Sequence, residues 1–549
     1  MPRYNASSHR GSFSVVRKWL VLSPLFLLAA AVTLHAQAPA PQSSLPRIEQ
    51  RDGRYALIVD GAPYLMLGAQ VNNSSAWPAL LPKVWPAIEA LHANTVEVPV
   101  YWEQFESSPG HFDDSVLLTL LQQARQHKVH LVLLWFGAWK NGSGHYTPEW
   151  IKLDNARYPR VICSDGRTMD SLSPLFQSTL EADRAAFTAL MRRLKAADPP
   201  HTVLMVQVEN EAGTWGCIRD YSPTAQRLFA GPVPAELIAG LHKQPGSWQQ
   251  VFGDDADEFF HAWNVAHYIG QVAAAGKAID PLPMYANAAL RDPFRPKRGS
   301  YESGGPTDNV LDIWKIAAPA LDVLSPDIYN PSYDAYTRYL ELYSRADNAL
   351  FIPETGNLPP YARYFFAALG HGAIGFSPFG MDFTATVNEP LGAPRLDKDA
   401  LAPFALDYAI VAPMDRELAR LSFEGKLQGV SESPTEHRQS LDFGSWRAVI
   451  SYGMPQFGFG KEPAGNPQPD GGALIGQLGP DEFLVAALHA RVDFTPAATG
   501  KQRQFVRVEE GSYENGVWRF ERVWNGDQTD YGLNFTSAPQ VLRVKLATY

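Results

Sequence analysis

The sequence predicts a (β/α)8 barrel followed by a smaller all-β domain. Short apolar runs alternate with helix-like segments eight times between residues 64 and 378, which is typical of a closed barrel of parallel strands. After about Gly425 the helix-like periodicity stops, and short alternating segments punctuated by Gly and Pro replace it. A length of 549 residues also exceeds what one compact domain usually holds.

The N-terminus has the pattern of a secretory signal. We expect residues 1–38 to be the signal and its cleavage site, and residues 39–46, rich in Pro and Ser, to be a disordered leader. No later stretch is apolar enough to span a membrane, so we expect an exported protein without a membrane anchor, either periplasmic or secreted. The signal consists of four basic residues, an apolar run and a small-x-small site: Arg3, Arg10, Arg17, Lys18, Trp19–Leu34 and Ala36–Ala38.

The net charge and the cysteine content restrict the classes of molecule that this protein can bind. The formal charge of −10 becomes −14 when the signal, with its four basic residues and no acidic one, is removed. A negative protein is a poor partner for nucleic acid, whereas a neutral substrate is compatible. The two cysteines, Cys163 and Cys217, lack nearby His residues at ligand spacing, so no metal site and no cofactor are expected. Whether they form a disulfide is left open, as is the oligomeric state.

The barrel domain is expected over residues 47–425. It begins with a hairpin, because Arg54–Val59 and Tyr64–Leu67 flank an Asp60-Gly61 turn signal. An eighth barrel helix is expected at Pro413–Leu421. The eight strand candidates are Tyr64–Ala69, Thr95–Val100, His130–Trp135, Val203–Glu209, Leu282–Asn287, Val323–Tyr329, Leu350–Glu354 and Ala373–Pro378.

The all-β domain is expected over residues 426–549, with a sandwich-like arrangement. Met454–Gly472 is rich in Gly and Pro and is expected to be one long loop. The strand candidates are Trp446–Tyr452, Glu482–Ala487, Gln504–Val508, Trp518–Trp524 and Gln540–Ala547.

Two of the barrel strands end in a carboxylate. The fourth run leads into Glu211, and the seventh ends in Glu354. Active sites of these barrels lie at the carboxyl ends of the strands, and a charge leaving a buried strand is costly unless it is paired or used. Two carboxylates that face one cleft are the machinery of glycoside hydrolysis, so we expect Glu211 and Glu354 to be catalytic.

Val206–Glu211, Val-Gln-Val-Glu-Asn-Glu, resembles the acid/base motif of glycoside hydrolase family 35, the β-galactosidases. This family belongs to a clan of retaining barrel glycosidases. The resemblance implies that Glu211 is the acid/base, that Glu354 is the nucleophile and that Asn210 binds the 2-hydroxyl of the sugar. It also implies that neither a metal nor a cofactor takes part.

Two further stretches are similar to the family. The stretch from Trp102 to Asp113 resembles a Trp-Asn-x-His-Glu-Pro-x-Pro-Gly-x-Phe-Asp pattern, with Glu103 and Phe105 as departures. Gly137-Ala138-Trp139 stands where many members carry the Ala-Glu-Trp that touches galactose, so the family's Glu is replaced by Ala138. The chain therefore resembles a divergent bacterial branch of family 35 that is close to family 42.

Other residues are weaker candidates for substrate contacts. Glu209 is expected either to support the acid/base through hydrogen bonds or to take part directly. Tyr329 is expected either to hydrogen-bond the nucleophile or to be a packing residue. Asp327 and Asp382 are interpreted as loop caps or local hydrogen-bond partners and not as catalysts. Trp102, Trp139 and Phe379 are candidate sugar platforms, although each alone is more often a packing residue, and Asn287 is a candidate polar contact.

The resulting expectation is a retaining exo-β-galactosidase that acts on an oligosaccharide. Galactosylated xyloglucan oligosaccharides of plant cell walls are the first candidate substrate. One alternative is another retaining barrel glycosidase, an endo-β-glycanase or a β-glucosidase, because a fold does not fix a substrate. The other is a carbohydrate-binding protein without activity, which the presence of both carboxylates disfavours.

Overall fold

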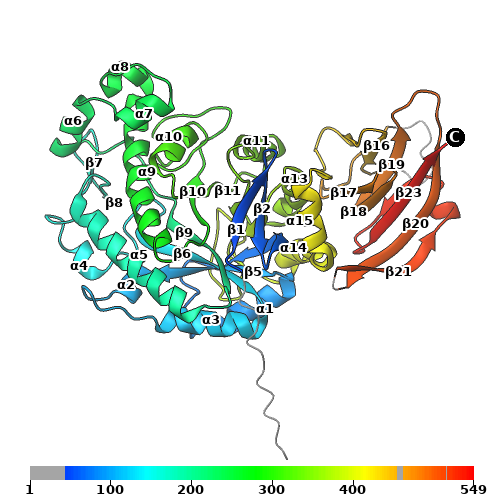
Figure 1. The fold of residues 1–549 in the computed structure, drawn as a ribbon, viewed down its shortest axis with the longest axis horizontal. Coiled ribbons are helices and arrows are strands. Elements are labelled where there is room, and N and C mark those ends of the chain that lie inside the picture. Colours follow the sequence, from blue (N-terminus) through cyan, green and yellow to red (C-terminus); the bar gives the residue numbers. More distant parts are fainter. Residues whose placement is uncertain (1–43, 454–461, 515) are drawn as a thin grey trace, which may run out of the picture. The chain divides into compact units, whose positions relative to one another are not determined.

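A computed structural model describes residues 44–453, 462–514 and 516–549 of the chain (Figure 1). The expected signal and most of the expected leader therefore lie outside the described residues. Among the described helices, none is both long enough and apolar enough to cross a membrane.

The first strands form a small antiparallel sheet next to the barrel. The hairpin expected from the Asp60-Gly61 turn is present, and a further strand pairs with it on the other side. Its order is β1 (Arg47–Arg51), β2 (Arg54–Val59) and β3 (Ala62–Tyr64).

Eight strands close into a barrel, as predicted, and all their pairings are parallel. Each expected apolar run contributes one strand, because Val-, Leu- and Ile-rich segments can be buried on both faces of a parallel sheet. In chain order the strands are β4 (Met66–Gln70), β5 (Thr95–Tyr101), β6 (His130–Lys140), β9 (Val203–Asn210), β10 (Met284–Ala289), β11 (Val323–Ile328), β12 (Ile352–Thr355) and β13 (Gly375–Pro378).

Helices surround the barrel, and the prediction missed some of them. The helix that follows β13 is α14, and the segment expected to be the eighth barrel helix is a later helix, α15. Pro403 lies inside α14, which hides a helical pattern in the sequence. The described α-helices are α1 (Leu81–Leu91), α2 (Trp102–Phe105), α3 (Ser115–His127), α4 (Glu149–Lys152), α5 (Gln177–Ala197), α6 (Pro223–Ala230), α7 (Ala235–Gly240), α8 (Trp248–Phe252), α9 (Ala256–Lys277), α10 (Leu311–Ala317), α11 (Tyr333–Tyr343), α12 (Pro359–Ala362), α13 (Tyr364–Gly370), α14 (Lys398–Val411) and α15 (Asp415–Phe423).

The C-terminal part is a sandwich of two antiparallel sheets, and the change from helix to strand falls between Phe423 and Leu427. A separate β-hairpin, β7 (Arg160–Ile162) and β8 (Thr168–Leu172), lies between β6 and β9 in the chain. One sandwich sheet has the order β14 (Leu427–Ser431), β17 (Gly472–Gly479), β18 (Glu482–Leu488), β23 (Val541–Thr548), β20 (Arg503–Glu514) and β21 (Val517–Trp524). The other has the order β15 (Arg438–Asp442), β16 (Trp446–Ser451), β19 (Ala490–Pro496) and β22 (Leu533–Phe535).

Strand β18 shows how the sandwich is attached. Phe483, Val485 and Ala487 face the core between the two sheets, whereas Leu484, Ala486 and Leu488 belong to the barrel's own core. Because side chains alternate along a strand, one sheet is buried on both of its faces. The all-β part therefore shares a hydrophobic core with the barrel.

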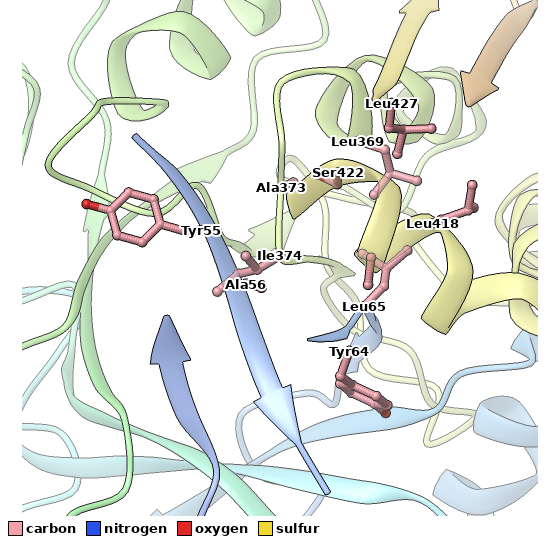
Figure 2. Close-up of a pocket in the computed structure, with 11 residues that line it drawn as sticks. Tyr55, Ala56, Tyr64, Leu65, Leu369, Ala373, Ile374, Leu418, Ser422 and Leu427 are labelled. Carbon is pink, nitrogen blue, oxygen red and sulfur yellow. The ribbon is translucent and has the colours of Figure 1, made fainter. Parts of the chain in front are cut away.

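A small apolar hollow lies where β2 and β3 meet the helices α13 and α15 (Figure 2). Leu65, Leu369, Leu418 and Leu427 line it, and its volume is about 10 Å³. That is room for at most one water, and apolar cavities of this kind stay dry. It is a packing feature of the barrel wall.

Candidate active site

Glu354 lies at the end of β12 and is held by three hydrogen-bond donors. Gln70 Nε2 at the end of β4 and Asn210 Nδ2 at the end of β9 donate to its Oε1 over 2.9 and 3.1 Å. The Tyr329 hydroxyl, just after β11, donates to Oε2 over 2.7 Å. The side chain is only 2% exposed, so these donors replace water around it. Hydrogen bonds to a carboxylate favour its ionised form, which a nucleophile needs.

Glu211 follows the last residue of β9 and is more exposed than Glu354. Its backbone has a φ of 42°, in the left-handed region that non-glycine residues rarely adopt. The Asn287 side chain at β10 holds this conformation, because its Oδ1 accepts from Glu211 N over 3.0 Å. Strained backbone of this kind persists only where its surroundings fix it, and it is common at active sites.

The pKa of Glu211 is raised to about 7, first by burial and then by the negative charge of Glu354. The positive charge of Lys140 and a hydrogen bond with Asp327 act in the opposite direction. A carboxyl group with this pKa keeps a proton near neutral pH and can release it during turnover. That is the requirement for a general acid/base.

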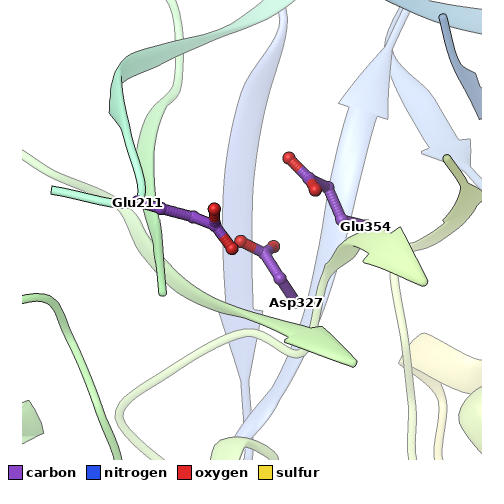
Figure 3. A group of neighbouring side chains, drawn as sticks. All are labelled: Glu211, Asp327 and Glu354. Atoms are coloured by element: carbon purple, nitrogen blue, oxygen red, sulfur yellow. The ribbon is translucent and has the colours of Figure 1, made fainter. Parts of the chain in front are cut away.

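The two glutamates lie close together, with Asp327 beside them (Figure 3). One carboxylate oxygen from each of Glu211, Asp327 and Glu354 lies within 4.8 Å of the others. Retaining glycosidases hold their two carboxyl groups about 5–5.5 Å apart, whereas inverting enzymes need about 6.5–9.5 Å to fit a water. The oxygens of the two glutamates thus approach more closely than the inverting arrangement requires.

Asp327 is not a loop cap, in contrast to the interpretation from sequence. It is buried at the end of β11, where Asn287 Nδ2 donates to its Oδ2 over 2.7 Å. Burial and the charges of Glu354 and Glu211 raise its pKa well above the usual range. Asp382, by contrast, does accept from its local backbone at Thr384 N, and it also accepts from Asn72 N, which is 310 residues away in the chain.

Two residues that contact this constellation were not singled out from sequence. Gln70 ends β4, and Lys140 ends β6. Lys140 Nζ donates to Asn210 Oδ1 over 2.7 Å, so the Asn210 amide connects Lys140 to Glu354. Asn210 is fully buried and donates to Glu354, and its expected contact with the 2-hydroxyl of the sugar stays a prediction. The sequence signal that could have identified Gln70 and Lys140 is a polar residue at the end of a buried strand.

A further buried carboxyl, that of Glu302, belongs to the loop after β10. It is 1% exposed, and neither of its carboxylate oxygens has a hydrogen-bond partner among the described residues. Burial and the charge of Glu211 raise its pKa well above the usual range. It packs against Gly142, where an added Cβ would clash with Glu302 Oε1. Glycine at position 142 therefore makes room for this side chain next to the acid/base strand.

The two tryptophans named as candidate sugar platforms are buried in this structure, in agreement with the alternative of a packing role. Trp102 is 0% and Trp139 1% exposed. Their indole nitrogens donate to Glu106 and Ser171, and both rings pack inside the barrel. A sequence shows where an aromatic ring lies along the chain, but its burial depends on segments that are distant in sequence.

Glu209 and Asn287 are likewise buried supports and not substrate contacts. Glu209 Oε2 accepts from Trp139 N over 2.7 Å, and its carboxyl also hydrogen-bonds that of Asp183. Burial and the charge of Asp183 raise the pKa of Glu209 well above its usual range. Asn287 connects Glu211 to Asp327, as described above. Phe379 is half-buried beside Tyr329, with ring centroids 6.4 Å apart.

A cavity of about 650 Å³ opens onto Glu211, Asp327 and Tyr329. Its volume falls in the range of small-molecule sites. The rest of its lining comes from the end of β10, from helix α11 and from the loops after β6, β9, β10, β11 and β13, namely Asn141, Trp215, Ala289, Leu290, Asp292, Asn330, Pro331, Tyr339 and Leu391.

Cys163 and Cys217 form a disulfide, which settles the question that the sequence left open. The bond joins the end of the β7 segment to the loop that follows Glu211. Both cysteines are buried with Val161 in a small apolar cluster of their own.

The three clustered carboxylates could supply oxygen ligands to a cation, but their neighbours fit one poorly. Hard cations such as Ca²⁺ take six to eight oxygen ligands. Here the Gln70 and Asn210 amides and the Tyr329 hydroxyl turn donors toward Glu354, and Lys140 adds a positive charge nearby. This donor set suits acid–base chemistry better than metal binding.

Comparison with known proteins gives few matches in sequence and many in structure. Residues 404–536 match a family described as a domain of unknown function, DUF5597; the match includes the end of α14, α15 and most of the sandwich. No curated protein matches the sequence.

Solved structures that match include β-galactosidases and a mannosidase, all at low identity. A β-galactosidase from Bacillus circulans sp. alkalophilus has 13% identity and a TM-score of 0.47, over 64% of this chain and 57% of its own. A catalytic mutant of Gan42B, a GH42 β-galactosidase from G. stearothermophilus, has 15% identity and a TM-score of 0.45, over 65% of this chain and 58% of its own.

An exo-β-1,4-mannosidase from Opitutaceae bacterium strain TAV5 has 16% identity and a TM-score of 0.42, over 68% of this chain and 63% of its own. The chain thus spans about three fifths of the length of these proteins. One fold hosts different substrates at identities of this size. The resemblance to family 35 stays a prediction.

Proposed function

We propose that this protein is a retaining β-glycosidase, specifically an exo-β-galactosidase that removes terminal galactose from oligosaccharides. One observation supports the reaction class: the oxygens of Glu211 and Glu354 approach within 4.8 Å, and the surroundings of the two carboxyl groups differ. Glu354 is surrounded by donors, and Glu211 has a pKa raised to about 7. Two carboxyl groups with different environments in one site are an acid/base and nucleophile pair.

In the first step, a Glu354 oxygen attacks the anomeric carbon while Glu211 gives its proton to the glycosidic oxygen. The bond to the leaving group breaks, and a sugar–Glu354 ester forms. The negative charge on Glu354 is thereby lost, and this charge is one of the causes that raise the pKa of Glu211. Glu211, now deprotonated, becomes the base for the second step.

In the second step, Glu211 takes a proton from a water, whose oxygen attacks the anomeric carbon and breaks the ester. Two inversions give a product with the original configuration. Tyr329, Gln70 and Asn210 recover their hydrogen bonds to the free carboxylate, which makes Glu354 a good leaving group.

Galactose as the sugar and an exported location rest on the sequence. The motif resemblance supports galactose, and the N-terminal pattern supports a periplasmic or secreted enzyme. Galactosylated xyloglucan oligosaccharides are the substrates that we propose. Ala138 stands where many members of family 35 carry a Glu that touches galactose. The preference for galactose is therefore the part of the proposal that the assay must decide.

A product assay tests the proposal. Galactosylated xyloglucan oligosaccharides, lactose and a panel of aryl β-glycosides are each incubated with the wild-type protein and with Glu354→Gln as the matched control. We expect galactose to be released from the galactosides by the wild type alone, and proton NMR to show the β-anomer first. Release of the α-anomer first would overturn the retaining mechanism. A preference for a glucoside or mannoside, or loss of polysaccharide viscosity, would overturn the galactosidase assignment.

A further inference from the structure

Trp215 is the aromatic residue that the catalytic cavity exposes most. It is 43% exposed and lines the same cavity as Glu211 and Tyr329. Its indole nitrogen makes no hydrogen bond to the part of the chain that the structure describes, so both ring and N–H are available to a ligand. An exposed Trp in a cavity with acidic and amide side chains is typical of a surface that binds a sugar ring.

The loop that carries Trp215 is fixed on both sides of the residue. Thr214 and Ser303 exchange two backbone hydrogen bonds, of 2.9 and 3.1 Å. Two residues after Trp215, Cys217 is tied by the disulfide to Cys163. Trp215 is thus held between two anchors, and a preorganised ring loses less entropy when a ligand binds.

The position of Trp215 places it on the leaving-group side of the site. Gly142 N donates to the Glu211 carbonyl over 2.9 Å, and an added Cβ at Gly142 would lie 3.1 Å from Trp215 Cδ1. The ring therefore packs on the glycine that touches the acid/base backbone. An acid/base protonates the oxygen of the leaving group, so the group that departs lies beside Glu211.

We propose that Trp215, with Asn141, Asp292 and Asn330 around the cavity, forms a subsite for the leaving group, and that this group is itself a sugar. The inference rests on the proposed function and names the residues that would bind the saccharide leaving group. Trp215 offers an apolar face to the C–H groups of a sugar ring. The amides and the carboxylate offer partners for its hydroxyls.

The test compares two glycosides of the same sugar that differ only in the leaving group: lactose and methyl β-galactoside. For Trp215→Ala we expect kcat/KM to fall about tenfold or more on lactose and to change less than about twofold on the methyl glycoside. Trp215→Tyr should recover part of the loss, because a smaller ring still stacks. Phe520→Ala, which removes a 51% exposed aromatic from β21 of the sandwich, is the matched control and should change neither value.

The anchors are tested separately with Cys163→Ser combined with Cys217→Ser. Loss on lactose with the methyl glycoside preserved would support the role of the disulfide in holding Trp215. An equal loss by Trp215→Ala on both glycosides, or no loss on lactose, would overturn the subsite while leaving the galactosidase proposal intact. If the wild type cleaves neither glycoside, the proposed function fails, whatever Trp215 does.

Discussion

The ends of β9 and β12 carry the same side chain into one cluster of carboxylates, yet the surroundings of the two side chains differ in kind. Glu354 at β12 is 2% exposed and receives three donors, from Gln70, Asn210 and Tyr329. Glu211 after β9 is more exposed, and the neighbour that hydrogen-bonds its carboxyl is another acid, Asp327. One carboxyl group is therefore prepared for negative charge, and the other is prepared to hold a proton.

This difference supports the proposed roles without reference to any related protein. Donors around a carboxylate stabilise the ion, and burial beside other carboxylates stabilises the acid. The nucleophile and the acid/base are thus distinguished by their neighbours, although the residue type is the same. Substitutions of either glutamate, or of a neighbour that distinguishes the two, should therefore have different effects.

Replacement of Glu354 by Gln should abolish turnover. We expect kcat to fall by about 10⁴-fold or more, because an amide cannot form the ester intermediate. Steady-state kinetics on an aryl β-galactoside measures the loss, and thermal unfolding followed by circular dichroism checks that the fold is kept. With Glu354→Ala, added azide should attack directly and give the α-azide. Formation of the β-azide instead would exchange the roles of the two glutamates.

Replacement of Glu211 by Ala should produce a loss that depends on the leaving group. We expect about 10²–10⁴-fold on lactose, whose departing oxygen needs a proton, and a much smaller loss on a dinitrophenyl galactoside, which departs without one. Azide should then react with the ester intermediate and give the β-azide. Equal losses on both substrates would contradict a role as general acid.

Removal of one donor from Glu354 should weaken catalysis without abolishing it. Tyr329→Phe takes away the 2.7 Å hydrogen bond to Oε2, and we expect kcat to fall about tenfold. Tyr336→Phe is the matched control: its hydroxyl lies 3.0 Å from Thr355 Oγ1, at the residue after Glu354, and does not reach the carboxylate. If the two variants lost the same activity, the effect of Tyr329 would be one of packing alone.

The smallest expected effect is a shift in the pH profile of kcat/KM. Glu211 must be protonated to act, and its pKa is raised to about 7, so kcat/KM should fall tenfold per pH unit above that value. The charge of Lys140 lowers this pKa. Lys140→Met should therefore raise it and move the falling limb to higher pH, by up to about one unit.

The control for this shift is Lys152→Met, which removes a half-buried lysine paired with Glu103 over 2.8 Å. We expect its pH profile to match that of the wild type. A limb that moved to lower pH in Lys140→Met would contradict the assignment of the titrating group to Glu211.

The sequence was sufficient for the barrel because its signals are local. Each strand is a run of apolar residues, and the position of Glu211 and Glu354 at strand ends is visible within a few residues of each. The prediction failed at two elements. Pro403 lies inside α14 and hides its helical pattern, and β1 was missed although the Asp52-Gly53 turn signal joins it to β2.

The partners of the two glutamates were decided by the tertiary structure alone. Gln70 and Glu354 are 284 residues apart, and Asn210 and Glu354 are 144 apart, yet closure of the barrel brings their side chains into contact. The same closure buries Trp102 and Trp139 and leaves Trp215 in the open cavity. A sequence thus determines which residues reach a strand end, whereas hydrogen bonds, burial and pKa depend on distances between strands that only the closed barrel sets.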